Sequence, residues 1–165
     1  MKKGLLILLS CLVFFSCYPC SGDIIDEAII ITLYEETRDT IGYEKDIDIH
    51  DTKDYWQSST ETETLGTGDC EDYVIAFMKK LHDIGIDSRL GLVSYVRVGK
   101  SGTHAIAIVY GVFYDPTKGY YGTLEEVCDW AISYNYLYSL SYNFVMAIAT
   151  KLGTRSLDTI DIIIE

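Results

Sequence analysis

The chain has 165 residues, of which 48% are hydrophobic and 23% charged, and its formal net charge is −12. This length and composition predict one globular domain and exclude a wholly disordered, fibrous or solenoid chain. The 25 acidic residues outnumber the 13 basic ones, which argues against a nucleic-acid partner, because binding to a duplex depends largely on Lys and Arg at phosphates.

The first residues predict an export signal. Residues 1–3 include two lysines, residues 4–15 are almost all apolar, and Ser16 is a small residue directly before Cys17. The apolar stretch is too short to cross a hydrocarbon core of about 30 Å as a helix. The layout resembles bacterial lipoprotein signals, in which the cysteine after the cleavage site is lipidated. We therefore expect residues 1–16 to be removed and Cys17 to carry a lipid.

Other interpretations of this region stay open. Cys11 follows Leu8-Leu9-Ser10, which fits the lipoprotein pattern better but leaves a very short apolar stretch, and Cys20 follows a proline. A plain secretory signal with incidental cysteines is a further alternative.

The expected location is the cell envelope, with a lipid anchor to a membrane that faces the periplasm or the exterior. Residues 17–22 are the expected anchor and linker, and residues 23–165 are the expected domain. In an oxidising envelope Cys20 and Cys128 are candidates for a disulfide.

Hydrophobic spacing predicts an α+β fold. An amphipathic helix is expected over residues 24–38 and mainly loop over 42–69. A second helix runs from Cys70 to Gly85, with its apolar side chains in one stripe. An antiparallel meander follows, with strands over 89–98, 103–110 and 112–115 and a hairpin loop over 99–102. The remaining expected elements are helices over 123–130 and 142–152 and a strand over 160–164.

The acidic loop contains a weak calcium-loop pattern. Asp46 and Asp48 have the right spacing, but the sixth and twelfth positions are Asp51 and Gln57, where that loop needs Gly and Glu. We therefore interpret this stretch as a charged, solvated loop.

Cys70 begins the second helix directly after Gly66-Thr67-Gly68-Asp69. Free N–H groups and the helix dipole at this end favour a thiolate, and the same groups can donate to an oxyanion. Cys70 is thus a candidate nucleophile, although a cysteine at this position is also a common small core residue.

A thiol nucleophile needs a base, and His104 is the best-placed candidate. His82 lies twelve residues after Cys70 on the same helix, which is ~18 Å away, and His50 lies in the acidic loop. If Tyr110-Gly111 is a two-residue turn, Asp115 becomes a diagonal neighbour of His104 across two strands. Its carboxylate then fixes the imidazole tautomer, although an Asp before Pro116 is also a common turn residue.

Four segments resemble the transglutaminase-like cysteine peptidase superfamily, in its order along the chain. They are Gly68-Asp69-Cys70-Glu71-Asp72-Tyr73, Gly85-Ile86-x-x-Arg89, His104-Ala105 and Tyr114-Asp115-Pro116, and Tyr55-Trp56-Gln57-Ser58 resembles the segment before the cysteine. The resemblance covers residues 54–118 and implies a papain-like core with Cys70 as nucleophile, His104 as base and Asp115 as its orienting partner. The chain departs from the pattern at Ile106, where many relatives have an aromatic residue, and the region after Thr117 matches nothing.

Two carboxylates, Asp69 and Glu71, flank the thiol and would raise its pKa if they were unpaired. Either they point away from it, with Asp69 capping the helix, or a cation such as calcium neutralises them. We expect no required metal or cofactor, with calcium near Asp69 and Glu71 as the alternative. Trp56 and Gln57 are candidate site residues, Gln57 as a second oxyanion donor, although Trp56 would equally well anchor the loop to the core.

The sequence therefore predicts acyl transfer through a Cys70 thioester, with a protein or peptide as substrate. Hydrolysis of a peptide or amide bond is favoured. Amine transfer or deamidation shares the acyl-enzyme and stays open, as does a catalytically silent binding module that uses the tyrosine-rich C-terminal half.

Overall fold

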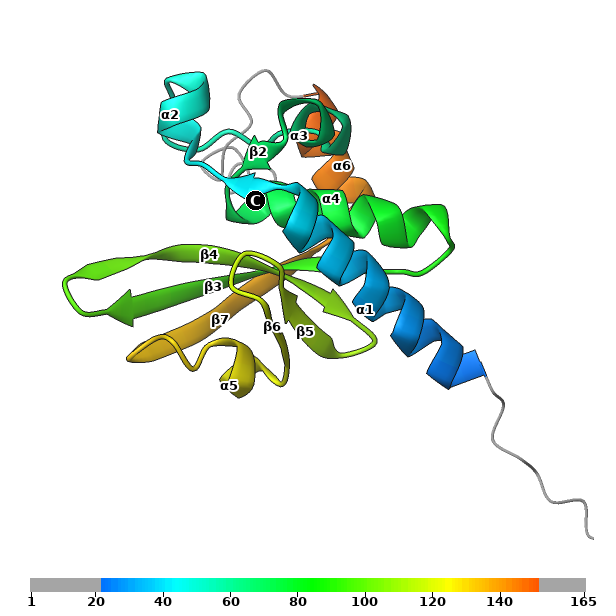
Figure 1. Cartoon of the computed structure of the whole chain (residues 1–165). Coiled ribbons are helices and arrows are strands. Elements are labelled where there is room, and N and C mark those ends of the chain that lie inside the picture. The colour runs from blue at the N-terminus through cyan, green and yellow to red at the C-terminus, as the bar shows by residue number, and fades with distance from the viewer. Residues whose placement is uncertain (1–21, 152–165) are drawn as a thin grey trace, which may run out of the picture.

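The structure, a computed structural model, describes residues 22–151 as a sheet with helices on both faces (Figure 1). In chain order the elements are α1 (Gly22–Thr40), β1 (Gly42–Tyr43), α2 (Asp46–His50), α3 (Ser59–Leu65), β2 (Thr67–Gly68), α4 (Cys70–Asp83), β3 (Arg89–Arg97), β4 (Lys100–Val109), β5 (Val112–Asp115), β6 (Tyr120–Gly122), α5 (Leu124–Val127), β7 (Ser133–Ser141) and α6 (Tyr142–Lys151). The predicted α+β class, with a cysteine at the start of a helix on an antiparallel sheet, is confirmed.

Five strands form the main sheet in the order β6-β5-β4-β3-β7, and every neighbouring pair is antiparallel. The predicted loop over residues 99–102 is wrong. Arg97 pairs with Lys100, so the turn contains only two residues, and Gly99 takes a positive φ of 72° there. Both strands continue to the turn because a glycine in this conformation closes a tight hairpin.

The turn between β4 and β5 confirms the predicted register. Tyr110 and Gly111 have φ values of 50° and 83°, and Val109 pairs with Val112 across them. Two successive residues with positive φ are typical of the type I′ turn, whose twist matches that of the strands it joins.

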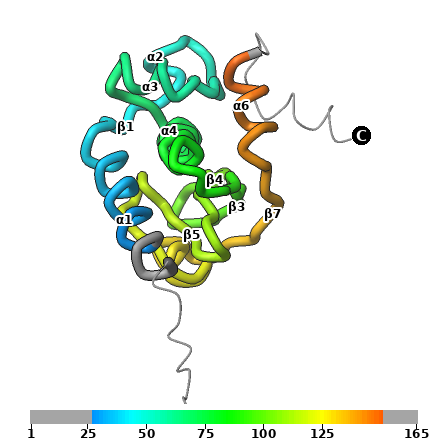
Figure 2. Tube along the Cα trace, turned by 90° about the vertical axis from the view of Figure 1, so that its right-hand side faces the viewer, coloured from blue at the N-terminus to red at the C-terminus, as the bar shows by residue number. Residues whose placement is uncertain are grey.

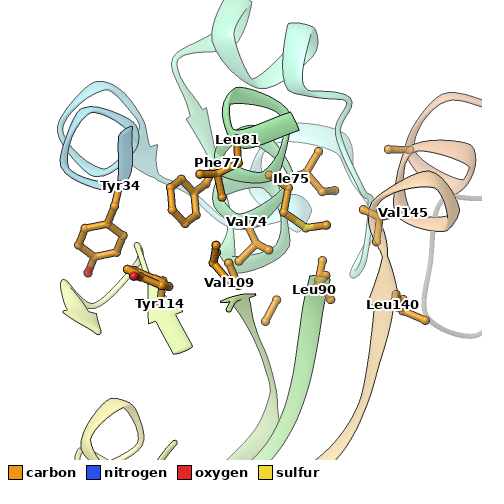
Figure 3. Close-up of a cluster of buried hydrophobic side chains, with 14 of the residues drawn as sticks. Tyr34, Val74, Ile75, Phe77, Leu81, Leu90, Val109, Tyr114, Leu140 and Val145 are labelled. Carbon is orange, nitrogen blue, oxygen red and sulfur yellow. The ribbon is translucent and has the colours of Figure 1, made fainter. Parts of the chain in front are cut away.

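The main core lies between α4 and the sheet. The predicted stripe on α4 is buried at Val74, Phe77, Met78 and Leu81, whereas Ile84, at the helix end, is exposed. In Figure 2, α4 is seen nearly end-on, with α1 on one side and α6 on the other. Figure 3 shows Phe77 of α4 lying near Tyr34 of α1.

A smaller apolar cluster covers the opposite face of the sheet. Val93 and Ile106 of the sheet pack there with Val127 and Cys128 from α5 and its end. Burial and the Asp115 carboxylate raise the pKa of the Cys128 thiol to about 11. Cys128 is a free thiol within the described residues, and Cys20, its predicted partner, lies outside them.

Several elements were not predicted. The expected loop over 42–69 contains α2, α3 and the parallel pair β1–β2, and the sheet gains β6 and β7. The expected helix over 123–130 is a single turn, begun by Thr123, which accepts a hydrogen bond from the Glu126 N–H at 3.3 Å.

The predicted export signal over 1–16, Cys11, Cys17 and the strand over 160–164 lie outside the described residues. Among the helices of residues 22–151, none is both long and apolar enough to span a membrane.

Candidate active site

Cys70 is the first residue of α4, and the backbone before it is held by Asp72. The Asp72 carboxylate accepts hydrogen bonds from the Gln57 N–H at 2.8 Å and from the Asp69 N–H at 3.1 Å. Gly68 allows this arrangement, because a Cβ atom there would lie 2.6 Å from Cβ of Asp72. The Asp72 carboxylate therefore links the start of α4 to its N-cap residue, Asp69, and to the segment that carries Trp56.

His104 and Asp115 form a buried pair on β4 and β5. Nε2 of His104 lies 2.6 Å from Oδ2 of Asp115, and the two side chains are 8% and 0% exposed. The Lys118 N–H donates to the other carboxylate oxygen at 3.0 Å. Asp115 is therefore fixed from both sides, and Nδ1 is the ring nitrogen that remains for other partners.

Cys70 and His104 line two cavities together with Thr103. The Trp56 cavity, of about 300 Å³, is further lined by Lys53, Asp54, Trp56, Asp69 and Glu71. The Trp130 cavity, of about 200 Å³, is further lined by Tyr43, Lys45, Arg97, Thr117, Lys118 and Trp130. The backbone of Ala105, next to His104, acts on the Cys70 thiol in the direction that lowers its pKa. The thiol and the imidazole thus lie at the boundary between the two cavities.

The other two histidines lie elsewhere. His50 stacks on Tyr55 with ring centroids 3.9 Å apart, and His82 stacks on Tyr142 at the same distance. Neither ring lines the Trp56 or the Trp130 cavity.

Trp56 and Gln57 differ in their position relative to the site. Trp56 lines the cavity named after it, is nearly fully buried, and donates from Nε1 to Oδ1 of Asp54 at 3.1 Å. Gln57 is fully buried and does not line that cavity. Trp56 therefore combines the two predicted roles, as an anchor of the loop and as a wall of the cavity.

Five carboxylates gather beside Cys70. Oxygen atoms of Asp46, Asp54 and Glu71 lie within 4.8 Å of one another, as do those of Asp46, Asp69 and Asp72. Burial, and then the charge of Asp69, raises the pKa of Asp46 to about 7 and that of Asp72 to about 8. The pKa values of Asp69 and Glu71 are also raised, mainly by burial. Such a cluster favours protons or a cation.

The same carboxylates act on the thiol. The Cys70 S–H donates to Oε2 of Glu71 at 3.1 Å. Burial, and then the charges of Glu71 and Asp69, raises the pKa of the Cys70 thiol well above its ordinary value. Without a bound cation, burial and the carboxylate charges outweigh the effect of the helix N-terminus, which the sequence analysis expected to favour the thiolate.

Two parts of the site were missed by the sequence analysis. Asp46 was assigned to a solvated loop, yet it is buried and accepts from the Tyr55 N–H at 2.5 Å. Trp130, beyond the stretch that resembles the superfamily, packs edge-on against His104 with ring centroids 5.4 Å apart. The Asp46-x-Asp48 spacing was a usable signal for the first, whereas no sequence signal pointed to Trp130.

Residues 27–113 match the sequence model of the bacterial transglutaminase-like cysteine proteinase (BTLCP) family. The match covers more than half of the 165 residues, so the chain belongs to this family and is a cysteine peptidase of the transglutaminase-like type. It includes Cys70 and His104 and ends two residues before Asp115.

Solved structures of Legionella pneumophila LapG share the fold. The calcium-bound form has a TM-score of 0.52 and 19% identity, over 70% of this chain and 72% of that chain. The EGTA-treated form has a TM-score of 0.50 and 19% identity, over 70% of each chain. No curated protein matches the chain in sequence.

Proposed function

We propose that the protein hydrolyses peptide bonds with Cys70 as nucleophile, His104 as general base and acid, and Asp115 as the residue that orients His104. The observation that carries this assignment is the buried 2.6 Å contact between His104 and Asp115, at cavities that His104 shares with Cys70. A carboxylate on one ring nitrogen fixes the tautomer and stabilises the imidazolium.

In the acylation step, His104 takes the thiol proton and the Cys70 sulfur attacks the carbonyl carbon of the substrate. The first N–H groups of α4 have no partner within the helix and are available to the oxyanion. His104 then gives its proton to the leaving amine as the C–N bond breaks. In deacylation, water attacks the thioester carbonyl while His104 takes a proton from the water. The C–S bond then breaks, His104 returns the proton to the Cys70 sulfur, and the carboxylic acid is released.

A library of intact proteins and long peptides, incubated with wild type and with Cys70→Ala, tests this function. Mass spectrometry is expected to find new termini that depend on Cys70. Deamidated glutamines or cross-links without new termini would instead assign the acyl-enzyme to deamidation or amine transfer. Identical products with both proteins would remove Cys70 from the chemistry.

We further propose that the acidic cluster binds calcium, with Asp46, Asp69, Glu71 and Asp72 as ligands and Asp54 beside them. Oδ1 of Asp46 and Oδ1 of Asp69 are buried and have no hydrogen-bond partner among the described residues, which suits them to a cation. Hard oxygen ligands of this kind are those that calcium prefers. The similarity to LapG, which is described in a calcium-bound form, supports the choice of ion. Bound calcium would offset the carboxylate charges beside the thiol.

We also propose that the protein is exported to the cell envelope and anchored there through a lipid on Cys17. The support is the sequence of residues 1–17, in which a basic start, an apolar stretch and Ser16 precede the cysteine. We expect Cys17→Ser to move the protein from the membrane to the soluble fraction of its host, as measured by immunoblotting, with unchanged activity in vitro. Membrane attachment that persists in this variant would place the anchor elsewhere, for example at Cys11.

A further inference from the structure

The two cavities that meet at Cys70 and His104 differ in charge. Three carboxylates, Asp54, Asp69 and Glu71, and one cation, Lys53, line the Trp56 cavity, whereas no carboxylate lines the Trp130 cavity. Three of the 13 basic residues of the chain, Lys45, Arg97 and Lys118, lie around the Trp130 cavity. A chain with a formal net charge of −12 thus places positive charge on one side of the candidate catalytic pair.

These cations lack anionic partners in the part of the chain with described side chains, residues 27–150. No ion pair there involves Lys45, Arg97 or Lys118. The Lys118 ammonium lies 5.9 Å from the ring centroids of both Tyr43 and Trp130. Aromatic rings at this distance attract a cation without neutralising its charge.

Two residues of the lining also carry a buried polar group. Nε1 of Trp130 and Oγ1 of Thr117 are buried, and neither has a hydrogen-bond partner among the described residues. An indole N–H can only donate, and a threonine hydroxyl can donate as well. A buried donor without a partner costs free energy, which a ligand that accepts from it recovers.

From this arrangement we infer that the Trp130 cavity binds a carboxylate group of the substrate, so that the protein selects peptides with Asp or Glu close to the cleaved bond. The inference rests on the proposed function, because the cavity opens onto the same thiol. A carboxylate satisfies the indole and hydroxyl donors and pairs with the cations of this cavity. A free C-terminal carboxylate has the same chemistry and is the second source to be tested.

The first arm of the test measures cleavage of matched peptides by the calcium-loaded protein. We expect the side-chain Glu form of a cleaved peptide to exceed its Gln form by about tenfold in kcat/KM, the magnitude of one charge-assisted contact. Arg97→Glu and Thr117→Val are expected to reduce this ratio by about three- to tenfold. Lys100→Glu is the matched control, since it makes the same charge change in the same hairpin outside the cavity. Peptides that end close to the cleaved bond, with a free or an amidated C-terminus, test the terminal carboxylate.

The second arm needs no substrate. Iodoacetate and iodoacetamide alkylate the same thiolate and differ in charge, so the ratio of their rates at Cys70 cancels the thiolate fraction. Peptide mapping follows Cys70 separately from the other cysteines. We expect Arg97→Glu, and Lys118→Met, which keeps the aliphatic stem, to lower the ratio of iodoacetate to iodoacetamide about three- to tenfold, and Lys100→Glu to change it far less.

The two arms separate the possible failures. Cleavage by wild type with equal rates for Glu and Gln, or with the preference intact in both Arg97→Glu and Thr117→Val, overturns the acidic subsite and leaves the peptidase assignment standing. Selection that depends only on a free C-terminus overturns the choice of Asp and Glu side chains. If wild type cleaves nothing, the proposed function fails. The alkylation ratio then decides the anion site, and a ratio unchanged in both variants overturns it.

Discussion

The contact between His104 and Asp115 determines which ring nitrogen of the imidazole is available to other partners. Nε2 points to the carboxylate, and Trp130 packs edge-on against the ring. The imidazole is therefore restricted both by a hydrogen bond and by packing. This restriction favours catalysis, because a general base that is already oriented loses less entropy in the transition state than one that must first reorient.

We expect Asp115→Asn to lower kcat by ~10–10³ without unfolding the protein. An amide keeps the shape of the carboxylate but neither offsets the imidazolium charge nor fixes the same tautomer. The loss should be smaller than the ~10⁴ of a serine triad, since a thiol depends less on its base. Turnover of any substrate from the library, with circular dichroism, checks this. Asp129→Asn, at an exposed position, is the control. Full activity of a folded Asp115→Asn variant would return Asp115 to a turn role.

At the scale of elements, the short pair β1–β2 and helix α2 bring remote carboxylates to the start of α4. Gly42 pairs with Thr67 and Tyr43 with Gly68, so residues 44–57 begin beside the cap of α4. The Tyr55 N–H then binds Asp46, and the Gln57 N–H binds Asp72. The acidic cluster thus connects three segments of the chain, and its charge state should affect the stability of their packing.

We expect calcium removal to make stability depend on pH. Without the ion, Asp46 and Asp72 have pKa values of about 7 and about 8, above the ~3.9 of an unfolded Asp. The folded chain then binds more protons than the unfolded chain between pH ~4 and ~8, so the free energy of unfolding falls as pH rises through this range. Calcium keeps the carboxylates ionised and removes that fall.

Thermal melts at pH 5.5 and 8.5, in excess calcium and in EGTA, measure this effect. Calcium is expected to raise Tm at pH 8.5 by about 5–10 °C. Asp46→Asn should reduce the rise, whereas Asp48→Asn, at an exposed position on the same short helix, should keep it. Equal pH slopes with and without calcium would remove the ion from the cluster.

A substitution at Gly68 tests the packing around the same acidic cluster. A Cβ atom there would lie 2.6 Å from Cβ and 2.7 Å from Oδ2 of Asp72, so we expect Gly68→Ala to lower the free energy of unfolding by about 1–3 kcal/mol. At Gly42, on the paired strand, the nearest atoms would be 3.5 Å away, and Gly42→Ala should change it by less than about 1 kcal/mol. Urea denaturation at fixed calcium compares the two. Equal losses would mean that close approach to Asp72 is not what requires Gly68.

At the scale of the whole molecule, Tyr34 joins α1 to the strands that hold Asp115. Its hydroxyl lies 3.0 Å from the Asp115 carbonyl oxygen and 3.1 Å from that of Tyr120, and its ring contacts Phe77 of α4 edge-on. One side chain thus ties the first helix, the central helix and the strand end beside the site.

We expect Tyr34→Phe to lower the free energy of unfolding by about 0.5–1.5 kcal/mol, because it removes a buried hydrogen bond while the Gly119 N–H still donates to the Asp115 carbonyl at 2.9 Å. Tyr110→Phe, whose tyrosine is 68% exposed, is the control and should be close to neutral. Chemical denaturation measures both variants. A neutral Tyr34→Phe would show that the Gly119 N–H alone satisfies the Asp115 carbonyl.

The sequence was most informative where contacts are local. The α4 stripe follows from helical spacing, and the β4–β5 register follows from the two-residue turn at Tyr110-Gly111. The closeness of His104 and Asp115 follows in turn from that register, so it could be predicted from the sequence.

Other parts depend on distant contacts or irregular pairing. Asp46 reaches the site through the β1–β2 pairing, which the composition of residues 42–69 does not predict. Strand β7 was missed although Tyr134, Tyr136, Tyr138 and Leu140 stand at every second position, as in a strand. Its pairing with β3 skips from Tyr136 to Tyr138, an irregularity that the sequence does not show.

The hairpin of β4 and β5 also determines where the gene can change its length. Side chains alternate between the two faces of a strand, so one inserted codon between Val112 and Asp115 would turn the carboxylate away from the imidazole. Added codons at Tyr110-Gly111 would lengthen only the exposed turn and leave the pairs from Val109 to Ala107 in place. Insertions and deletions should therefore accumulate at this turn among related genes, while the distance along the chain from Val112 to Asp115 stays constant.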